Sequence, residues 1–206
     1  MTAEKIIEVL NAVAAKIISE KDYLTELDNV IGDGDHGINM ARGMGEVIKK
    51  LEGMSSSSPA DIFKTTGMTL VSTVGGASGP LYGTFFLKFA AALNGISDVS
   101  VSDFVKALSA AVDGVSQRGH STRGEKTMLD AMYPSLDAMN TALSEDASAA
   151  QVLSKGIAAA CEGRDRTADI AATKGRASYL GERSIGHIDP GAASYTMMLE
   201  ILGENV

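Results

Sequence analysis

The sequence predicts an all-α protein, and two observations carry this prediction. Apolar residues recur at three- and four-residue spacing through most of the chain, and residues 3–19 follow the i, i+3, i+4, i+7 rule without a miss. Alternating patterns typical of β-strands are nearly absent. The chain has 206 residues, 45% of them hydrophobic. It therefore suits a single domain over residues 1–206 with a substantial core.

The periodicity predicts eight helices. The first covers residues 3–19 and has Asp28 near its end, and the second runs from about Gly37 to Leu51. Ser58 is expected to cap the third helix, with Pro59 at its first position. We expect a kink at Pro134, because proline removes a helical hydrogen bond. The remaining helices are expected at residues 79–93, 100–117, 125–143 and 147–172, and from Asp189 and Pro190 onward, and an interruption within residues 162–169, "EGRDRTAD", is left open.

Four connections between these helices are rich in glycine, namely residues 32–37, 75–79, 119–124 and 175–191. In an antiparallel up-and-down bundle, alternate connections fall at the same end of the molecule. Segments that are distant in the sequence can meet there. The predicted architecture therefore offers one end at which a single site could form.

The connection before the second helix concentrates carboxylates. Asp28, Asp33 and Asp35 lie within eight positions, and Gly34 between the last two can adopt a positive φ that brings neighbouring side chains together. Carboxylate oxygens are hard ligands suited to Mg²⁺, Mn²⁺ or Ca²⁺. An EF-hand is excluded, since Ile38 occupies the position that requires glycine. From this stretch alone, a metal site and a solvated acidic turn both remain open.

Composition excludes several classes of function. The net charge of −8 disfavours binding to nucleic acid or to an anionic membrane. No apolar run reaches the roughly 18–20 residues that a membrane span needs, and the first residues do not resemble a signal peptide. Cys161 is the single cysteine, so no internal disulfide can form. These features predict a cytoplasmic protein.

Three other glycine-bearing segments are considered as anion sites. Residues 75–79, "GGASG", could present backbone N–H groups at a helix N-terminus. Residues 119–127, "GHSTRGEKT", resemble a Walker A loop but fail as one, because Glu125 separates the glycine from the lysine and no strand precedes them. The long segment before the last helix carries Lys174, Arg176 and Arg183, which are unusual residues for a simple connector.

Four stretches together resemble the nucleotide-binding L subunits of bacterial phosphotransferase-system-dependent dihydroxyacetone kinases. They extend from residue 27 to residue 192 and so cover most of the chain. The stretches are "LDNVIGDGDHGINMARGM", "TGMTLVSTVGGASGPLYGTFF", "RGEKTMLDAMYP" and "KGRASYLGERSIGHIDPGA".

The resemblance implies an eight-helix antiparallel barrel with the nucleotide at one end. It implies that Asp28, Asp33 and Asp35 hold two Mg²⁺ ions against the phosphates of ADP or ATP. No single catalytic residue is implied, since the reaction would depend on metal and positioning. The residues implied to bind the nucleotide are His36, Gly37, Ile38, Asn39, Ala77, Ser78, Gly119, Met128, Arg176, Asp189, Pro190 and Gly191.

The resemblance further implies a kinase made of several subunits. A separate K subunit would hold dihydroxyacetone, and a phosphohistidine-bearing M subunit would recharge the ADP that stays bound. A homodimer is left open, as is the identity of the sugar acceptor. Three other functions compete with this one: a nucleotide-binding regulatory module, a kinase subunit for another small polyol or ketose, and a Mg²⁺-dependent phosphohydrolase that uses the aspartates alone.

Overall fold

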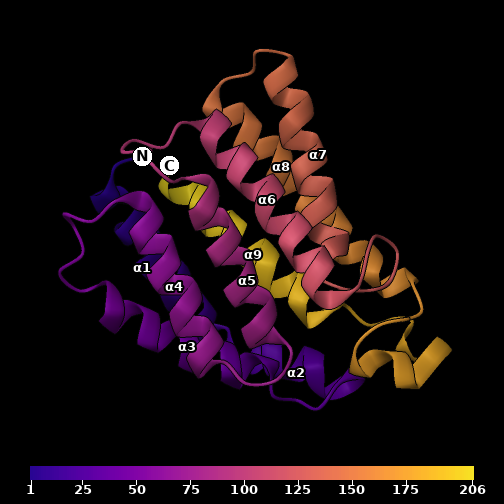
Figure 1. Ribbon diagram of the computed structural model, residues 1–206. Helices are drawn as coiled ribbons and strands as arrows, with labels where there is room; N and C mark the ends of the chain where they lie inside the picture. The colour runs from indigo at the N-terminus through magenta and orange to yellow at the C-terminus, as the bar shows by residue number, and fades with distance from the viewer.

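Nine α-helices and two short 3₁₀ segments make up the regular structure, and the chain has no β-strand (Figure 1). The computed structural model describes residues 1–206 without a gap. The all-α prediction is therefore confirmed. The elements are α1 (Ala3–Ser19), α2 (Lys21–Ile31), α3 (His36–Leu51), α4 (Pro59–Thr73), α5 (Ser78–Ala92), α6 (Val101–Gly119), α7 (Leu129–Ser144), α8 (Ala149–Arg166), η1 (Thr167–Asp169), η2 (Arg176–Ser184) and α9 (Pro190–Asn205).

Helix starts follow the capping residues that the sequence displays. Ser58 caps α4, Ser100 and Asp103 form a capping box at α6, and Asp189 caps α9. In each case a side-chain oxygen accepts a hydrogen bond from the backbone N–H three residues further on, which satisfies a group that has no partner within the helix. These three helix starts were predicted correctly.

The prediction missed α2. Residues 21–31 form a helix of their own, separated from α1 by Glu20 alone, so Asp28 lies in the last turns of α2 and not near the end of α1. Leu24, Leu27 and Ile31 follow helical spacing here, but most other residues of this short stretch are polar. The periodic signal is present, but a short and polar stretch is also typical of a connection.

One predicted helix start was wrong, and one helix ends within the stretch where an interruption was left open. The helix expected over residues 125–143 begins at Leu129, because Asp130 accepts hydrogen bonds from the backbone N–H groups of Gly124 and Thr127 and folds the preceding residues into a turn. Lys126 in that turn has a φ of +60°, which no helix allows. The helix expected over residues 147–172 is α8 and ends at Arg166, where a 3₁₀ turn follows.

Pro134 lies within α7 as expected, and α8 packs closely against α7 one turn before this proline. Proline has no N–H to donate to the carbonyl of Asp130, four residues earlier. Gly163 of α8 lies directly against that carbonyl, and a Cβ at this position would overlap it. The glycine therefore allows α8 to approach α7 closely at the end of the barrel where α7 begins.

Eight of the nine helices form a closed ring. Each of α1, α3, α4, α5, α6, α7, α8 and α9 contacts the next, and α9 contacts α1 again. The chain runs up and down around this ring, so the connections α2–α3, α4–α5, α6–α7 and α8–α9 all lie at one end (Figure 1). The predicted eight-helix barrel is confirmed, with α2 as an addition beside α3.

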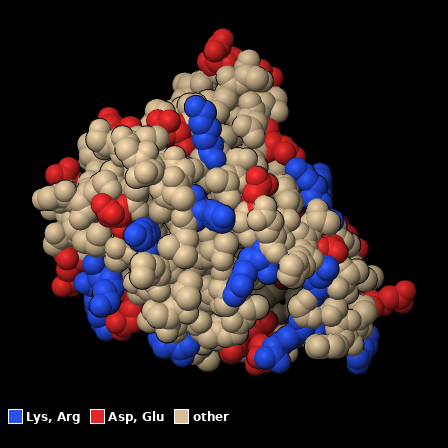
Figure 2. All heavy atoms as spheres, in the orientation of Figure 1, with Lys and Arg blue, Asp and Glu red and all other residues tan.

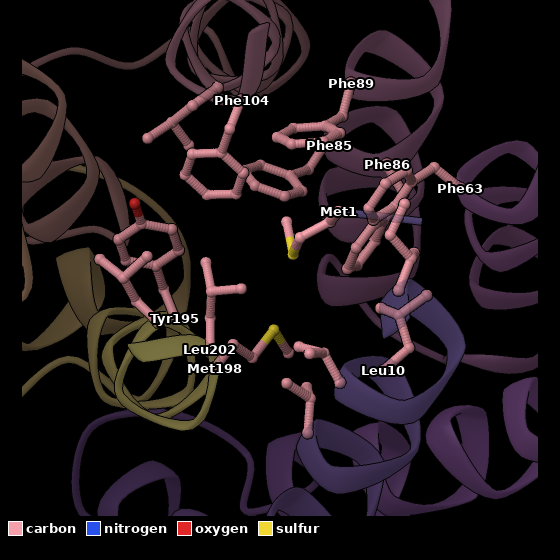
Figure 3. Close-up of a pocket in the computed structure, with 15 residues that line it drawn as sticks. Met1, Leu10, Phe63, Phe85, Phe86, Phe89, Phe104, Tyr195, Met198 and Leu202 are labelled. Carbon is pink, nitrogen blue, oxygen red and sulfur yellow. The ribbon is translucent and has the colours of Figure 1, made fainter. Parts of the chain in front are cut away.

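The interior of the ring is apolar and contains a small cavity of about 80 Å³. Figure 3 shows Phe85, Phe89 and Phe104 on one side of this cavity and Met198 and Leu202 on another. Burial of each such side chain stabilises the fold by roughly 1.5–3 kcal/mol. All 15 lining residues are hydrophobic, so a polyphosphate would find no partner here. No helix is both long and apolar enough to cross a membrane.

Candidate nucleotide and metal site

A second and larger cavity lies at the end of the barrel where the four glycine-rich connections meet. Its volume is about 350 Å³. Residues from all four connections line it, as the up-and-down topology predicted. Figure 2 shows basic and acidic side chains next to each other around a hollow at the lower right of the visible face. Eleven of the 25 lining residues are polar or charged, among them four aspartates, two arginines and a lysine, which suits a charged ligand.

Three carboxylates converge on this cavity. One oxygen from each of Asp28, Asp33 and Asp35 lies within 4.8 Å of the other two. Asp28 is buried, Asp35 is half-buried and Asp33 is exposed, so the group reaches from the wall of the cavity to solvent. The structure therefore brings together the three residues in which the sequence predicted metal ligands.

The backbone around these carboxylates is shaped by Asp28 and by glycine. Asp28 Oδ2 accepts hydrogen bonds from the backbone N–H groups of Asp35 at 2.9 Å and His36 at 3.1 Å. Asp35 is the N-cap residue of α3, yet its own side chain makes no capping bond. A Cβ at Gly32 would overlap the Asp28 carboxylate, and Gly34 has a φ of +72°. Asp28 thus holds the turn, while the carboxylate of Asp35 stays available to a ligand.

The charges in this cluster fit a divalent cation. Two carboxylates about 4 Å apart repel by about 4 kcal/mol at an effective dielectric constant near 20. The one basic partner is Arg176, whose Nη2 lies 2.9 Å from Asp33 Oδ2. The Arg176 side chain is 65% exposed, so this ion pair contributes only about 0–1 kcal/mol. Three hard oxygen ligands open to a polar cavity are the donor set that Mg²⁺ or Mn²⁺ prefers.

Helix N-termini supply the complementary groups for an anion. Helices α3, α5 and α9 all begin at the cavity, and Ala77, Ser78, Pro190 and Gly191 line it. The first N–H groups of a helix have no partner within the helix and carry a partial positive charge. A polyphosphate in this cavity would therefore meet N–H donors on one side and metal ligands on the other.

His36 connects these helix N-termini through a buried hydrogen-bond network. Its Nδ1 lies 2.8 Å from Ser78 Oγ, and its Nε2 lies 2.9 Å from Ser194 Oγ. Tyr82 extends the network, with its hydroxyl 2.7 Å from Ser194 Oγ. Burial lowers the pKa of His36 to about 4, although the neighbouring Asp28 opposes the change. His36 is therefore neutral near pH 7 and positions Ser78 without adding a positive charge.

The opposite wall of the cavity is more apolar. Gly119, Met128, Leu81 and Val115 line it, and a Cβ at Gly191 would lie 3.2 Å from that of Met128. This wall could receive the flat base of a nucleotide. Arg118, Ser121 and Thr127 also line the cavity; Ser121 and Thr127 belong to the 119–127 segment, whereas no sequence pattern had marked Arg118.

Asp189 joins this wall to the start of α9. Its Oδ2 accepts the hydrogen bond of Ala192 N at 2.7 Å. Burial raises the pKa of Asp189 to about 7, and the acidic neighbours Asp130 and Asp28 add to that effect. The carboxyl group is therefore poised to change charge when a cation or a hydroxyl-bearing ligand arrives.

Three residues implied to bind nucleotide lie beside the cavity and not on its surface. Gly37 packs against the carbonyl of Lys21, and Ile38 is 50% exposed on the outer face of α3. Asn39 Oδ1 accepts a hydrogen bond from Arg42 at 2.6 Å, and its side chain lies next to Gly75. Asn39 therefore supports the α4–α5 connection. The other nine residues of the implied nucleotide set line the cavity.

Sequence reasoning missed Ser194 and Tyr82. Ser194 is 158 positions from His36, and Tyr82 is 112 positions from Ser194. Both residues sit within ordinary helical periodicity, where Ser194 has no local signature. Only the closure of the ring, which brings α9 next to α3 and α5, reveals their role.

Fold and site together define a class of protein, a helical barrel whose open end is suited to a metal-bound anion. A family model described as "DAK2 domain" matches residues 30–204. The chain belongs to this DAK2 family. It is 44% identical over 194 residues to the ADP-binding subunit DhaL of PEP-dependent dihydroxyacetone kinase 1 from Listeria innocua, which covers 94% of this chain and 91% of the relative.

Two further comparisons also match the chain to dihydroxyacetone kinases. The ADP-binding subunit DhaL of the PEP-dependent dihydroxyacetone kinase of Escherichia coli is 42% identical over 184 residues, covering 89% of this chain and 88% of the relative. The crystal structure of the C. freundii dihydroxyacetone kinase in complex with AMP-PNP and Mg²⁺ superposes with a TM-score of 0.73 at 26% identity. The match covers 97% of this chain and 33% of that one.

Proposed function

We propose that this chain is the ADP-binding subunit of a phosphoenolpyruvate-dependent dihydroxyacetone kinase, a phosphotransferase. The observation that carries the proposal is the convergence of Asp28, Asp33 and Asp35 within 4.8 Å at the mouths of three helices. Similarity over nearly the full length of the DhaL relatives supports it. The AMP-PNP and Mg²⁺ complex of the C. freundii kinase supports the ligand class.

Within this proposal, each residue of the site has a defined part. Asp28, Asp33 and Asp35 hold two Mg²⁺ ions, and Ala77 and Ser78 at the start of α5 bind the phosphates. Arg176, whose guanidinium lies next to Asp33, adds a positive charge for the phosphates. Met128, Gly119 and the segment Asp189–Gly191 border the nucleoside. When bound, the Mg²⁺-nucleotide supplies the phosphoryl-accepting and phosphoryl-donating group of the reaction.

The site residues suit phosphoryl transfer because that reaction needs positioning and charge neutralisation more than covalent help from the protein. The buried His36 is neutral and fixes Ser78, so it serves as a support and not as a base. The cavity contains no nucleophilic cysteine, since Cys161 lies elsewhere and contacts Glu200. The bound metal, the helix N-termini and Arg176 would therefore position the phosphates and neutralise their charge.

The other substrates belong to partner subunits in this proposal. The match covers 33% of the C. freundii kinase chain, and the DhaL relatives are named as subunits. We infer that a K subunit holds dihydroxyacetone and that a phosphohistidine-bearing M subunit, which draws on phosphoenolpyruvate, recharges the nucleotide. Both partners would approach the open end of the barrel, because the cavity opens there.

A reconstituted assay tests the proposal. The purified chain is mixed with a K subunit, an M subunit with its phosphorylating proteins, phosphoenolpyruvate and dihydroxyacetone. We expect dihydroxyacetone phosphate to form, and we expect none when this chain is omitted or replaced by its Asp33→Ala variant. A complete mixture without product would favour the regulatory module, and phosphate release by the chain alone would favour the phosphohydrolase.

A further inference from the structure

Lys126 is a buried lysine in the turn between α6 and α7. Its side chain is 1% exposed, and no other lysine or arginine of the chain is buried. The residue adopts a φ of +60°, which is uncommon for a residue other than glycine. A strained backbone and a buried ammonium persist only where the surroundings hold them in place. None of the functional residues described above explains this arrangement.

The ammonium of Lys126 joins the two ends of the segment between α8 and α9. Its Nζ donates hydrogen bonds to the backbone carbonyls of Thr167 and His187. Next to these bonds, Asp189 N donates to Thr167 Oγ1 at 2.9 Å. Residues 167 and 187–189 therefore form a neck that Lys126 and Thr167 close, and the residues between them project from it as an arm.

The two segments that this neck joins, the arm and the start of α9, both belong to the site. The arm carries Lys174 and Arg176, which line the cavity, and the neck leads directly into Asp189, Pro190 and Gly191. On the other side, Lys126 is followed by Thr127 and Met128, which line the apolar wall of the cavity. The buried ammonium thus connects the α6–α7 turn to the start of α9, beside a hydrogen bond from Thr173 N to Glu125 O that ties the same turn to the arm.

The charges around Lys126 fit this role. Asp130 holds the turn by accepting hydrogen bonds from Gly124 N and Thr127 N, and Asp130, Asp169 and Asp189 are the acidic groups near the ammonium. Burial lowers the pKa of Lys126, and these three carboxyl groups oppose that change. Asp28, Asp33 and Asp35 are not among the carboxyl groups that act on the Lys126 ammonium.

We propose that Lys126 is a positioning residue that sets the nucleoside side of the cavity by clamping the neck at residues 167 and 187–189. The inference rests on the proposed function, because it assumes an adenine nucleotide in the cavity. Lys126 itself does not line the cavity and contacts no ligand there. Its loss releases Met128 and Asp189–Gly191 from each other, whereas the aspartates and the start of α5 keep their places.

The test compares two probes, Mg²⁺–ADP and Mg²⁺–pyrophosphate, by calorimetric titration of the full chain and its Lys126→Met variant. Pyrophosphate reports on the aspartates, the start of α5 and Arg176, whose exposed side chain contributes little, while ADP also needs the nucleoside wall. We expect ADP affinity to fall about tenfold or more and pyrophosphate affinity to change by less than about threefold. A smaller folded fraction would weaken both probes equally, so the ratio of the two affinities isolates positioning.

The matched control is Lys155→Met, which removes an exposed lysine paired with Glu145 at the far end of α8 and should leave both affinities unchanged. If Lys126→Met does not fold, Thr167→Val keeps the carbonyl and removes only the hydroxyl that accepts from Asp189 N. This variant should lower the ADP-to-pyrophosphate affinity ratio about threefold.

An unchanged affinity ratio in Lys126→Met, or in Thr167→Val where it is the variant that folds, overturns the inference about the neck. A wild-type chain that binds neither probe is a different result, because it overturns the proposed function itself. An equal loss of both probes by a folded Lys126→Met variant also overturns the inference, since it means that the lysine supports the whole end of the barrel and not the nucleoside side.

Discussion

Within residues 28–36, Asp28 stabilises the turn, whereas Asp33 and Asp35 are available to bind a ligand. One carboxylate oxygen of Asp28 accepts hydrogen bonds from two backbone N–H groups, so the turn depends on Asp28 even without a ligand. Asp33 and Asp35 make no hydrogen bond to the backbone, and Asp33 is exposed. Substitutions at these positions should therefore separate folding from binding.

Asp33→Ala should abolish retention of metal and nucleotide while the helical fold survives. The exposed carboxylate contributes little to folding, within about 0.5 kcal/mol for an ordinary surface substitution, but it is a third of the metal-ligand set. Native mass spectrometry of the purified variant, beside circular dichroism, provides the measurement. Copurification of the variant with stoichiometric ADP would show that the metal ligands are assigned incorrectly.

Arg176→Ala should weaken ADP binding less than Asp33→Ala does, because the metal ions supply most of the positive charge that the phosphates meet. The Arg176 side chain is mostly exposed, so its contribution is also screened by solvent. ADP titrations of both variants at the same Mg²⁺ concentration measure this ranking. Equal losses of affinity in the two variants would contradict it.

His36 should make the stability of the ligand-free chain depend on pH. Burial lowers its folded-state pKa to about 4 from the ordinary 6.5, so the folded state prefers the neutral ring. The stability from this preference is fully present above pH 6.5 and is lost as pH falls toward 4, at roughly 1.4 kcal/mol per pH unit inside that window.

Comparing wild type with His36→Asn isolates this effect, since Asp189 acts in the opposite direction with a raised pKa of about 7. We expect the stability difference between the two proteins to shrink as the pH is lowered from 7 to 4.5 in urea unfolding experiments. A difference that stays constant over this range would mean that His36 is not held neutral by burial.

At the scale of single residues, local sequence could predict the aspartates but not their supports. Asp33 and Asp35 are marked by the glycines around them, and Asp28 by its short distance from them. Lys126, Tyr82 and Ser194 carry no such mark. Their partners lie 41 to 158 positions away, so these contacts exist only after the ring has closed.

At the scale of helices, local chemistry predicted the starts of elements better than their ends. Ser58, Ser100 and Asp189 were readable because a cap needs only residues three positions apart. The start of α7 was misjudged because Asp130 turns the chain through hydrogen bonds to residues that look helical by composition. Helix α2 was missed although Leu24, Leu27 and Ile31 follow helical spacing, because the rest of this short segment is mostly polar.

Two glycines test how the helices pack. Gly163→Ala should lower the free energy of unfolding by about 1–3 kcal/mol, because its Cβ would overlap the Asp130 carbonyl and push α8 from α7. The control is Gly45→Ala in α3, where a Cβ meets nothing within 4 Å, and it should raise stability by about 0.5–1 kcal/mol. Urea unfolding of the two variants measures both, and a Gly163→Ala variant as stable as wild type would contradict the close approach of α7 and α8.

At the scale of the whole molecule, the ring gives its two ends different roles. The connections α2–α3, α4–α5, α6–α7 and α8–α9 meet at the cavity, while the connections α3–α4, α5–α6 and α7–α8 lie at the opposite end. Hydrophobic periodicity predicted the number of helices in the ring and the alternation of its ends. It could not show that α9 closes against α1, because any amphipathic helix could have packed there.

Mg²⁺–ADP should therefore slow hydrogen exchange at one end of the barrel only. We expect protection in residues 32–36, 75–79, 119–128 and 174–191, since the ligand would join these four connections. Residues 52–58, 93–100 and 145–148 at the opposite end should exchange as they do without ligand. Mass-spectrometric exchange measures this pattern, and uniform protection at both ends would show that binding stabilises the chain without a localised site.

The most direct measurement is a crystal structure of the chain grown with Mn²⁺ and ADP, using the anomalous signal of manganese to locate the ions. We expect Mn²⁺ between the carboxylates of Asp28, Asp33 and Asp35, and we expect the phosphates of ADP at the N-terminus of α5. A structure with ADP elsewhere, or with the three carboxylates turned apart and no ion between them, would contradict the metal–nucleotide site.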